Sequence, residues 1–288
     1  MRFALLFLAF VLAGCGSRGT NRIVQQDRAV PQRIVSMNPC VDAVLMEIAD
    51  PATIAGISHY SQDPRATSIP LDQARRFSAV SDEAEDIVAL RPDLVIAGSH
   101  VSIQTIAALK RLGIPLMQLG VPASVAEDKA QISMIAARIG RKPQGERLNA
   151  AIARALAAAS PPEGKPISAM IWQSSGLVPG TGTLADDLLT RTGFSNESAR
   201  MGLHQWDILP LEDLLTRPPP VLLSGTASMD LGDADANRML NHPALRMAGK
   251  RIRTADYPAN LLHCGGPVII RAAARLATIR RNVQDTTG

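Results

Sequence analysis

Imidazole and aromatic side chains are scarce in this chain, and most of them fall in a few short loops. Phe, Trp and Tyr make up only 3% of the 288 residues, and there are five histidines. An imidazole nitrogen can ligate a transition metal or the metal of a chelate, and an aromatic ring with one polar tip suits the face of a large flat ligand. The residues of these types in predicted loops are His59, Tyr60, His100, His204, Trp206, Tyr257 and His263.

The spacing of these histidines does not indicate a local metal site. No His-x-x-His or His-x-x-x-His pair occurs, so the four loop histidines would have to converge from distant segments, and each can equally be an ordinary polar group. The chain also lacks a Gly-x-Ser-x-Gly elbow, a glycine loop ending in Lys and a His-Glu-x-x-His motif. An enzyme is therefore the less favoured alternative to a binding protein, and we expect no cofactor.

Strand-like and helix-like segments alternate on both sides of a helical stretch. Residues 32–121 predict a first lobe, residues 122–160 two linking helices, and residues 161–288 a second lobe in which the alternation resumes. Ser124 followed by Glu127 predicts the start of the first linking helix, and the Ala-rich second one is stiff. The sequence therefore predicts an α/β fold. We expect two doubly wound lobes with mostly parallel sheets, a rigid α-helical backbone and a ligand cleft between the lobes.

One fourteen-residue pattern occurs twice. "EDIVALRPDLVIAG" covers residues 85–98 and "EDLLTRPPPVLLSG" covers residues 212–225. Each begins with Glu-Asp, has a Pro seven residues after the Glu, and ends with an apolar run and Gly. Each lobe is thus expected to carry an equivalent short helix followed by a buried strand.

The first residues have the pattern of a targeting signal. "MRFALLFLAFVLAGC" joins one Arg and a short apolar run to Leu-Ala-Gly-Cys, which resembles the lipobox of bacterial lipoproteins. We expect residues 1–14 to be removed, Cys15 to carry the lipid, and residues 15–31 to form a polar tether. This places the protein in the periplasm, anchored to a membrane by its lipid. Gly16 gives a weak indication of the outer membrane, but the choice between inner and outer membrane stays open.

Several segments together resemble a known family. "RIVSMNP", "AGISHYSQDP", "EDIVALRPDLVIAG" and "HQWDILPLEDLL" occur in the order and spacing found in the helical-backbone class of substrate-binding proteins of bacterial ABC importers. The likeness is greatest to cobalamin-binding and iron-siderophore-binding proteins, and it covers residues 32 to 283.

The resemblance implies a non-enzymatic, monomeric receptor that captures a metal chelate and delivers it to the membrane subunits of an importer. Cobalamin or a related corrinoid is the expected ligand; an iron-siderophore, haem or a free transition metal is the alternative. The resemblance also implies that Glu85 and Glu212 contact arginines of the importer. Both acids begin a predicted helix, so a helix-dipole role alone would also explain them. The net charge of +4 is scattered and does not indicate nucleic acid.

Cys40 and Cys264 depart from the family pattern. Cys40 lies at the start of the first predicted helix and Cys264 in the loop before the last one, so both are expected near the cleft. After export they could form a disulfide, which requires Cα atoms within about 7 Å. They could instead contact the ligand as soft metal ligands, or simply be buried.

Overall fold

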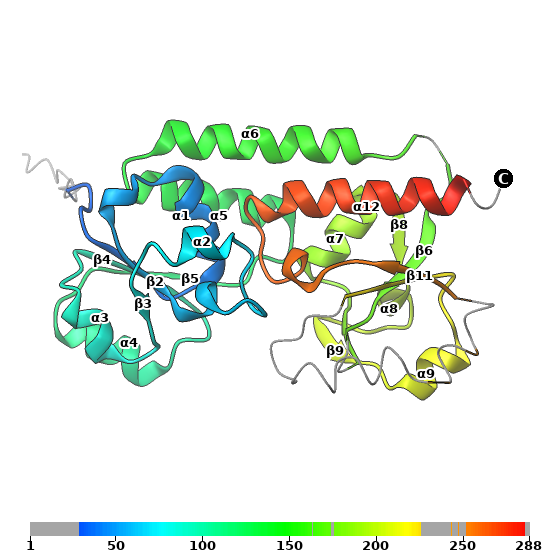
Figure 1. The fold of residues 1–288 in the computed structure, drawn as a ribbon, viewed down its shortest axis with the longest axis horizontal. Helices are drawn as coiled ribbons and strands as arrows, with labels where there is room; N and C mark the ends of the chain where they lie inside the picture. The colour runs from blue at the N-terminus through cyan, green and yellow to red at the C-terminus, as the bar shows by residue number, and fades with distance from the viewer. Residues whose placement is uncertain are drawn as a thin grey trace, which may run out of the picture.

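Two α/β lobes make up the protein, and one long helix runs across both. The computed structural model describes residues 29–162, 164–173, 176–225, 243, 247 and 252–285. Helix α6 (Lys142–Ala159) extends along one edge of the molecule from the first lobe to the second (Figure 1). The predicted signal segment, Cys15 and most of the tether lie outside the described residues. Within the described ranges, no helix combines the length and apolar character needed to cross a membrane.

The first lobe is built on a five-stranded parallel sheet in the order β3-β2-β1-β4-β5. Its strands are β1 (Ile34–Ser36), β2 (Ile54–Ser58), β3 (Ala79–Val80), β4 (Leu94–Gly98) and β5 (Leu116–Leu119). Its helices are α1 (Pro39–Ile48), α2 (Leu71–Ala74), α3 (Ala84–Ala89) and α4 (Ile103–Arg111), with the short 3-10 turns η1 (Pro51–Thr53) and η2 (His59–Gln62). Asn38 starts α1, because its side chain accepts a hydrogen bond from the Cys40 N–H and Pro39 follows it.

The second lobe repeats this plan with one addition. Its parallel sheet has the order β11-β10-β6-β8, and an antiparallel pair, β7 and β9, stands beside it. The strands are β6 (Ile167–Ile171), β7 (Leu177–Pro179), β8 (Phe194–Asn196), β9 (Trp206–Ile208), β10 (Val221–Ser224) and β11 (Arg253–Asp256). The helices are α7 (Leu184–Arg191), α8 (Glu197–Arg200), α9 (Leu211–Thr216) and α12 (Val268–Asp285), with the 3-10 turn η3 (Ala259–Leu261).

The fourteen-residue repeat forms the same unit in each lobe. In the first lobe α3 leads into β4, and in the second lobe α9 leads into β10. Both strands lie in the interior of their sheets, where they are flanked on each side by another strand. A strand buried on both faces reads as a continuous apolar run, which explains why the two segments look alike.

Successive apolar side chains along the strands point alternately into two kinds of core. One is a core shared by both lobes, and the other is a smaller core within each lobe. Ile34 and Val221 belong to one continuous cluster that includes residues of α1, α5 (Val125–Arg138), α6 and α12. Their neighbours Val35 and Leu222 point to the opposite faces and belong to two smaller clusters, one in each lobe. The lobes are therefore joined through a common core.

The α-helical backbone is packed against both lobes along its length. Helix α6 contacts both α5 and α12, which lie below it in Figure 1, one toward each end. A β-carbon at Gly145 of α6 would lie only 2.5 Å from the β-carbon of Ala136 of α5, so the glycine permits their close approach. The α/β fold with two mostly parallel sheets and a helical backbone is confirmed, and α6 is also a packed element of the core.

Candidate ligand-binding site

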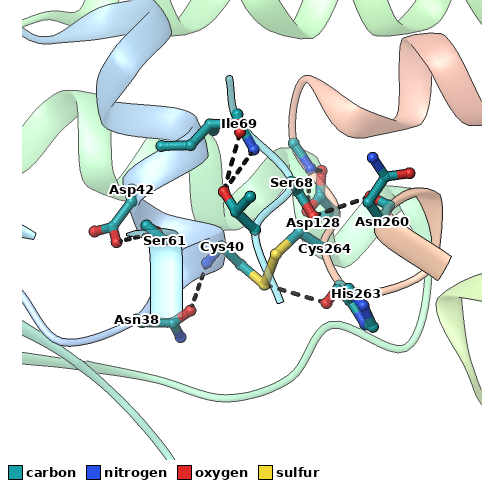
Figure 2. Close-up of a disulfide and its surroundings, with 12 residues drawn as sticks. Asn38, Cys40, Asp42, Ser61, Ser68, Ile69, Asp128, Asn260, His263 and Cys264 are labelled. Atoms are coloured by element: carbon teal, nitrogen blue, oxygen red, sulfur yellow. Dashed lines mark hydrogen bonds between the residues drawn. A yellow bond between two sulfur atoms is a disulfide. The ribbon is translucent and has the colours of Figure 1, made fainter. Parts of the chain in front are cut away.

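The carboxyl ends of the strands in the two lobes are joined by a disulfide. Cys40 follows β1 and begins α1, and Cys264 lies between η3 and α12. Their sulfur atoms are bonded, with Cα atoms 4.9 Å apart, and Figure 2 shows the bridge between the two segments. The Cys40 sulfur also lies 3.2 Å from the carbonyl oxygen of His263. Of the arrangements left open by the sequence, the structure has the disulfide.

Hydrogen bonds on the same border connect the lobes further. The Ser68 hydroxyl donates to the Asn260 carbonyl at 3.0 Å, and the Arg271 guanidinium donates to the Ser68 carbonyl. Both carboxylate oxygens of Asp128 on α5 accept from the Gly266 N–H at 2.9 Å. Burial raises the pKa of Asp128 to about 6, although the bond from Gly266 opposes the rise. The contacts of Ser68 tie the first lobe to the second, and those of Asp128 tie α5 to the loop before α12.

His59 and Tyr60 form one half of the candidate site. They lie in η2, directly after the carboxyl end of β2, and their ring centroids are 4.0 Å apart. Nδ1 of His59 lies 3.1 Å from the Val80 carbonyl oxygen. Because a carbonyl can only accept, Nδ1 carries the proton of the neutral ring and Nε2 keeps its lone pair. Both residues are exposed, Tyr60 to 37%.

His100 is attached to the neighbouring strand ends. It follows β4, and its Nε2 lies 3.1 Å from the Met37 carbonyl oxygen just beyond β1. The ring lies over Gly98, where a β-carbon would come within 2.6 Å of Nδ1. The side chain is exposed, but its two nitrogens are turned toward the backbone, so His100 is less suited than His59 to bind a metal.

Trp206 begins β9 of the second lobe, and His204 lies just before it, where it forms an isolated bridge with Thr181. Gly180 and Gln205 are joined by a backbone hydrogen bond of 2.6 Å, and Gln205 in turn donates to Thr181 at 2.9 Å. A β-carbon at Gly180 would lie 2.3 Å from the Leu203 carbonyl oxygen, so only glycine allows this approach. Trp206 is 39% exposed, and His204 is exposed too. The backbone hydrogen bonds of Gln205, which lies between them, hold this segment in place.

Tyr257 and His263 lie differently from the expectation. Tyr257 is only 1% exposed and belongs to the continuous core, and this burial raises the pKa of its phenol above the usual value. Its ring packs in the core, which corrects the expectation that it meets a ligand. His263 is half-buried beside the disulfide. Among the described residues there is no group of three or more His, Cys, Asp or Glu side chains able to hold a metal ion.

Asp42 is a buried acid near the candidate site that the sequence did not single out. It lies in the first turn of α1 beside the disulfide, and its side chain is fully buried (Figure 2). Burial raises the pKa of Asp42 to about 7, while the nearby side chains of Ser36 and Ser61 and the N–H of Ser58 oppose the rise. An acid in the first turn of a helix normally suggests an exposed position, so the sequence carried no signal for this burial.

The two acids expected to meet an importer are both exposed. Glu85 lies in the first turn of α3 and Glu212 in the first turn of α9. Figure 1 places α3 and α9 in different lobes, both on the side of the molecule away from α6. Within the described ranges, neither carboxylate forms a salt bridge.

A hollow of about 530 Å³ lies on another part of the surface. It is formed by α1, residues 68–73, α6 and the first turn of α12. None of the residues predicted to bind a ligand lines it. Its position against the helical backbone separates it from the strand ends that carry His59 and Trp206.

Comparison with known proteins gives a consistent result. A cobalamin-binding protein of Halobacterium salinarum is 24% identical over 266 residues, covering 88% of this chain and 70% of that protein. A periplasmic heme-binding protein of Roseiflexus sp. RS-1 in its apo form has a TM-score of 0.73 with 22% identity, over 89% of this chain and 99% of that one. A periplasmic vitamin B12-binding protein of Vibrio cholerae has a TM-score of 0.69 with 16% identity, over 88% and 98%.

The likeness to the solved structures establishes the fold. A family model gives the membership of the chain. A model of the family described as periplasmic binding protein matches residues 34–250, which span both lobes and the helical backbone. Because this match covers most of the chain, the protein belongs to the periplasmic binding protein family.

Proposed function

We propose that this protein is a lipid-anchored receptor of the periplasm that captures a flat metal chelate and delivers it to an ABC importer. The observation that carries the proposal is the pair of exposed aromatic surfaces, His59 with Tyr60 in one lobe and Trp206 in the other. The strand ends of the two lobes are held together by the Cys40–Cys264 bond, so a ligand between them would meet both surfaces. Flat rings gain apolar burial against a macrocycle while a polar tip supplies one directional bond. Binding is the whole chemistry in this proposal, and no catalytic step is involved.

A corrinoid such as cobalamin is the first ligand we propose. The relative in Halobacterium salinarum, which carries that name, supports it. The test is calorimetric titration of the purified protein with cyanocobalamin, in oxidised and reduced samples. We expect micromolar or tighter binding that is lost in Trp206→Ala. No heat in either state would exclude cobalamin and leave an iron-siderophore, haem or a free metal as ligand of the same receptor.

Haem is the second candidate, and the geometry of His59 favours it. Haem iron accepts an axial imidazole or phenolate ligand, and Nε2 of His59 keeps its lone pair because Nδ1 is tied to Val80. Haemin titration followed by absorbance tests this candidate. An axial ligand from η2 predicts a haem spectrum that changes in His59→Ala or Tyr60→Phe. A spectrum unaltered by both substitutions would contradict iron ligation by this turn.

Delivery requires a second surface, and we propose that Glu85 and Glu212 supply it. Each carboxylate is exposed at the start of a short helix, one in each lobe. Two carboxylates on one side of the receptor make a two-point contact for arginines of the importer's membrane subunits. A monomeric receptor with one such face suffices for this contact.

A further inference from the structure

The buried carboxyl group of Asp42 has a role beyond helix formation. Its exposed fraction is 0%, although it lies only three residues after the helix start at Pro39. Removing a carboxylate from water costs free energy unless hydrogen-bond partners compensate. The partners of Asp42 therefore indicate what the residue does.

Two hydrogen bonds connect Asp42 to the turn that carries His59 and Tyr60. Oδ2 accepts the Ser58 N–H at 3.0 Å and the Ser61 hydroxyl at 2.6 Å. Ser58 directly precedes His59, and Ser61 directly follows Tyr60, so the two bonds bracket the pair. Ser58 is the N-cap residue of η2, but its own side chain makes no capping hydrogen bond. Asp42 instead holds the turn from α1, by accepting the N–H of Ser58 itself and the hydroxyl of Ser61.

We propose that Asp42 is a positioning residue of the ligand site, whose carboxyl group holds the Ser58–Ser61 turn and so sets the direction in which His59 and Tyr60 project. The consequence for ligand affinity rests on the proposed function, whereas the consequence for the turn does not.

The other side-chain contacts of the turn do not hold its beginning, which Asp42 does. Gln62 donates to the carbonyl oxygens of Ala74 and Phe77 at 3.2 and 2.9 Å, which holds the end of η2. The bond from His59 to Val80 holds one ring but not the backbone beneath it. Asp42 is the contact at the beginning of the turn, and it acts on both sides of the ring pair. Side chains that are ordered before the ligand arrives lose less freedom on binding, so the order increases affinity.

The geometry of the Asp42 carboxyl group allows its hydrogen bonds and its charge to be tested with different variants. Both bonds converge on Oδ2, whereas Oδ1 has no hydrogen-bond partner in the part of the chain that the structure describes. In Asp42→Asn the amide oxygen can take the place of Oδ2 and the amide nitrogen that of Oδ1. This variant keeps the two bonds, and Asp42→Ala removes both. Ser61→Ala removes one bond from the opposite side.

The test combines nuclear magnetic resonance of the purified protein with titrations by cyanocobalamin and haemin. In Asp42→Ala we expect loss of the contact signal between the His59 and Tyr60 rings. Exchange of the Ser58 amide should become at least about tenfold faster, and affinity for the bound ligand should fall at least about tenfold. Asp42→Asn should resemble the wild type in all three measurements, and Ser61→Ala should lie between.

Asp128→Ala is the matched control, because Asp128 is a second buried carboxyl group with a raised pKa and its hydrogen bonds go to Gly266. It should leave the ring contact unchanged. A folded Asp42→Ala variant with the ring contact and affinity of the wild type would overturn the proposal, as would an Asp42→Asn variant that behaves like Asp42→Ala. If Asp42→Ala does not fold, an unchanged turn in Ser61→Ala would overturn it. If the wild type binds neither ligand, the proposed function fails, and ring contact and amide exchange still decide the role of Asp42.

Discussion

Cys40 and Cys264 are bonded across the border of the two lobes although 224 residues separate them in the chain. The bond joins the start of α1 to the loop before α12. It therefore closes a loop that contains most of both sheets and the linking helices α5 and α6. A crosslink of this kind limits the unfolded chain far more than it limits the folded protein.

Removal of the disulfide should destabilise the whole protein. For Cys40→Ser with Cys264→Ser we expect the free energy of unfolding to fall by about 2–5 kcal/mol, because the unfolded chain regains the freedom of a long loop. Denaturant unfolding followed by circular dichroism measures this change. The wild type with added reductant should show the same loss. Equal midpoints for the wild type and the double variant would contradict a disulfide in the folded protein.

Gly265→Ala should weaken the contact between the lobes. A β-carbon at this position would lie 2.0 Å from Oδ1 of Asp128, which is buried and bound to Gly266. We expect a loss of about 1–3 kcal/mol, since a side chain forced into a filled core displaces its neighbours. Thermal and denaturant unfolding measure the loss. Gly120→Ala is the control: no atom lies within 4 Å of its added β-carbon, and stability should change by less than about 0.5 kcal/mol.

Stability should decrease as the pH rises from about 4 to about 7 through the titration of two buried acids. The pKa of Asp42 rises from 3.8 to about 7 on folding, and that of Asp128 from 3.8 to about 6. Above pH 4 the unfolded chain releases these protons before the folded protein does, so the unfolded state is favoured increasingly until the folded groups also ionise. Each group contributes about 1.4 kcal/mol per pH unit at most.

The contribution of Asp42 exceeds that of Asp128 between pH 6 and 7, because folded Asp128 is at least about half ionised there whereas folded Asp42 is still mostly protonated. In this window Asp42→Asn should flatten the dependence of the unfolding free energy on pH. Chemical denaturation at pH 5, 6, 7 and 8 gives the two curves. An Asp42→Asn curve parallel to that of the wild type between pH 6 and 7 would show that Asp42 does not titrate in this range.

Charge reversal of Glu85 and Glu212 should weaken binding to the importer without changing the affinity for the ligand. For Glu85→Lys with Glu212→Lys we expect unchanged affinity for the ligand but binding to the importer weakened at least about tenfold, because two attractive contacts become repulsive. Calorimetry and a pull-down with the importer in detergent measure the two properties. Glu146→Lys, an exposed charge reversal on α6, is the control for net charge and should deliver normally. Normal delivery by the double variant would exclude this docking face.

Much of the fold could be predicted from local sequence. Ser124 does begin α5, where its hydroxyl accepts the Glu127 N–H. The two fourteen-residue segments do form equivalent helix-strand units, because each has a short apolar run of strand length after the proline that ends its helix. The β7–β9 pair was not predicted, since its short strands depend on a close approach of Gly180 and Leu203, which α7, β8 and α8 separate in the chain.

The candidate site was predictable in its loops but not in its individual residues. Tyr60, Trp206 and Tyr257 looked alike in sequence, yet two are exposed and Tyr257 is buried beneath the segment that contains it. Asp42 and Glu85 are both acids in the first turn of a short helix, yet one is buried against Ser61 and the other is exposed.

The sequence by itself determined the order of strands and helices, the two-lobe α/β plan and the loops that carry the rare aromatic and imidazole side chains. These features depend on hydrophobic periodicity, proline and capping residues, whose effects are local. Tertiary structure alone decided that Cys40 meets Cys264, that Tyr257 faces the core and that Asp42 supports His59 and Tyr60. Burial and pairing depend on contacts between residues far apart in the chain, and no local pattern records which faces will meet.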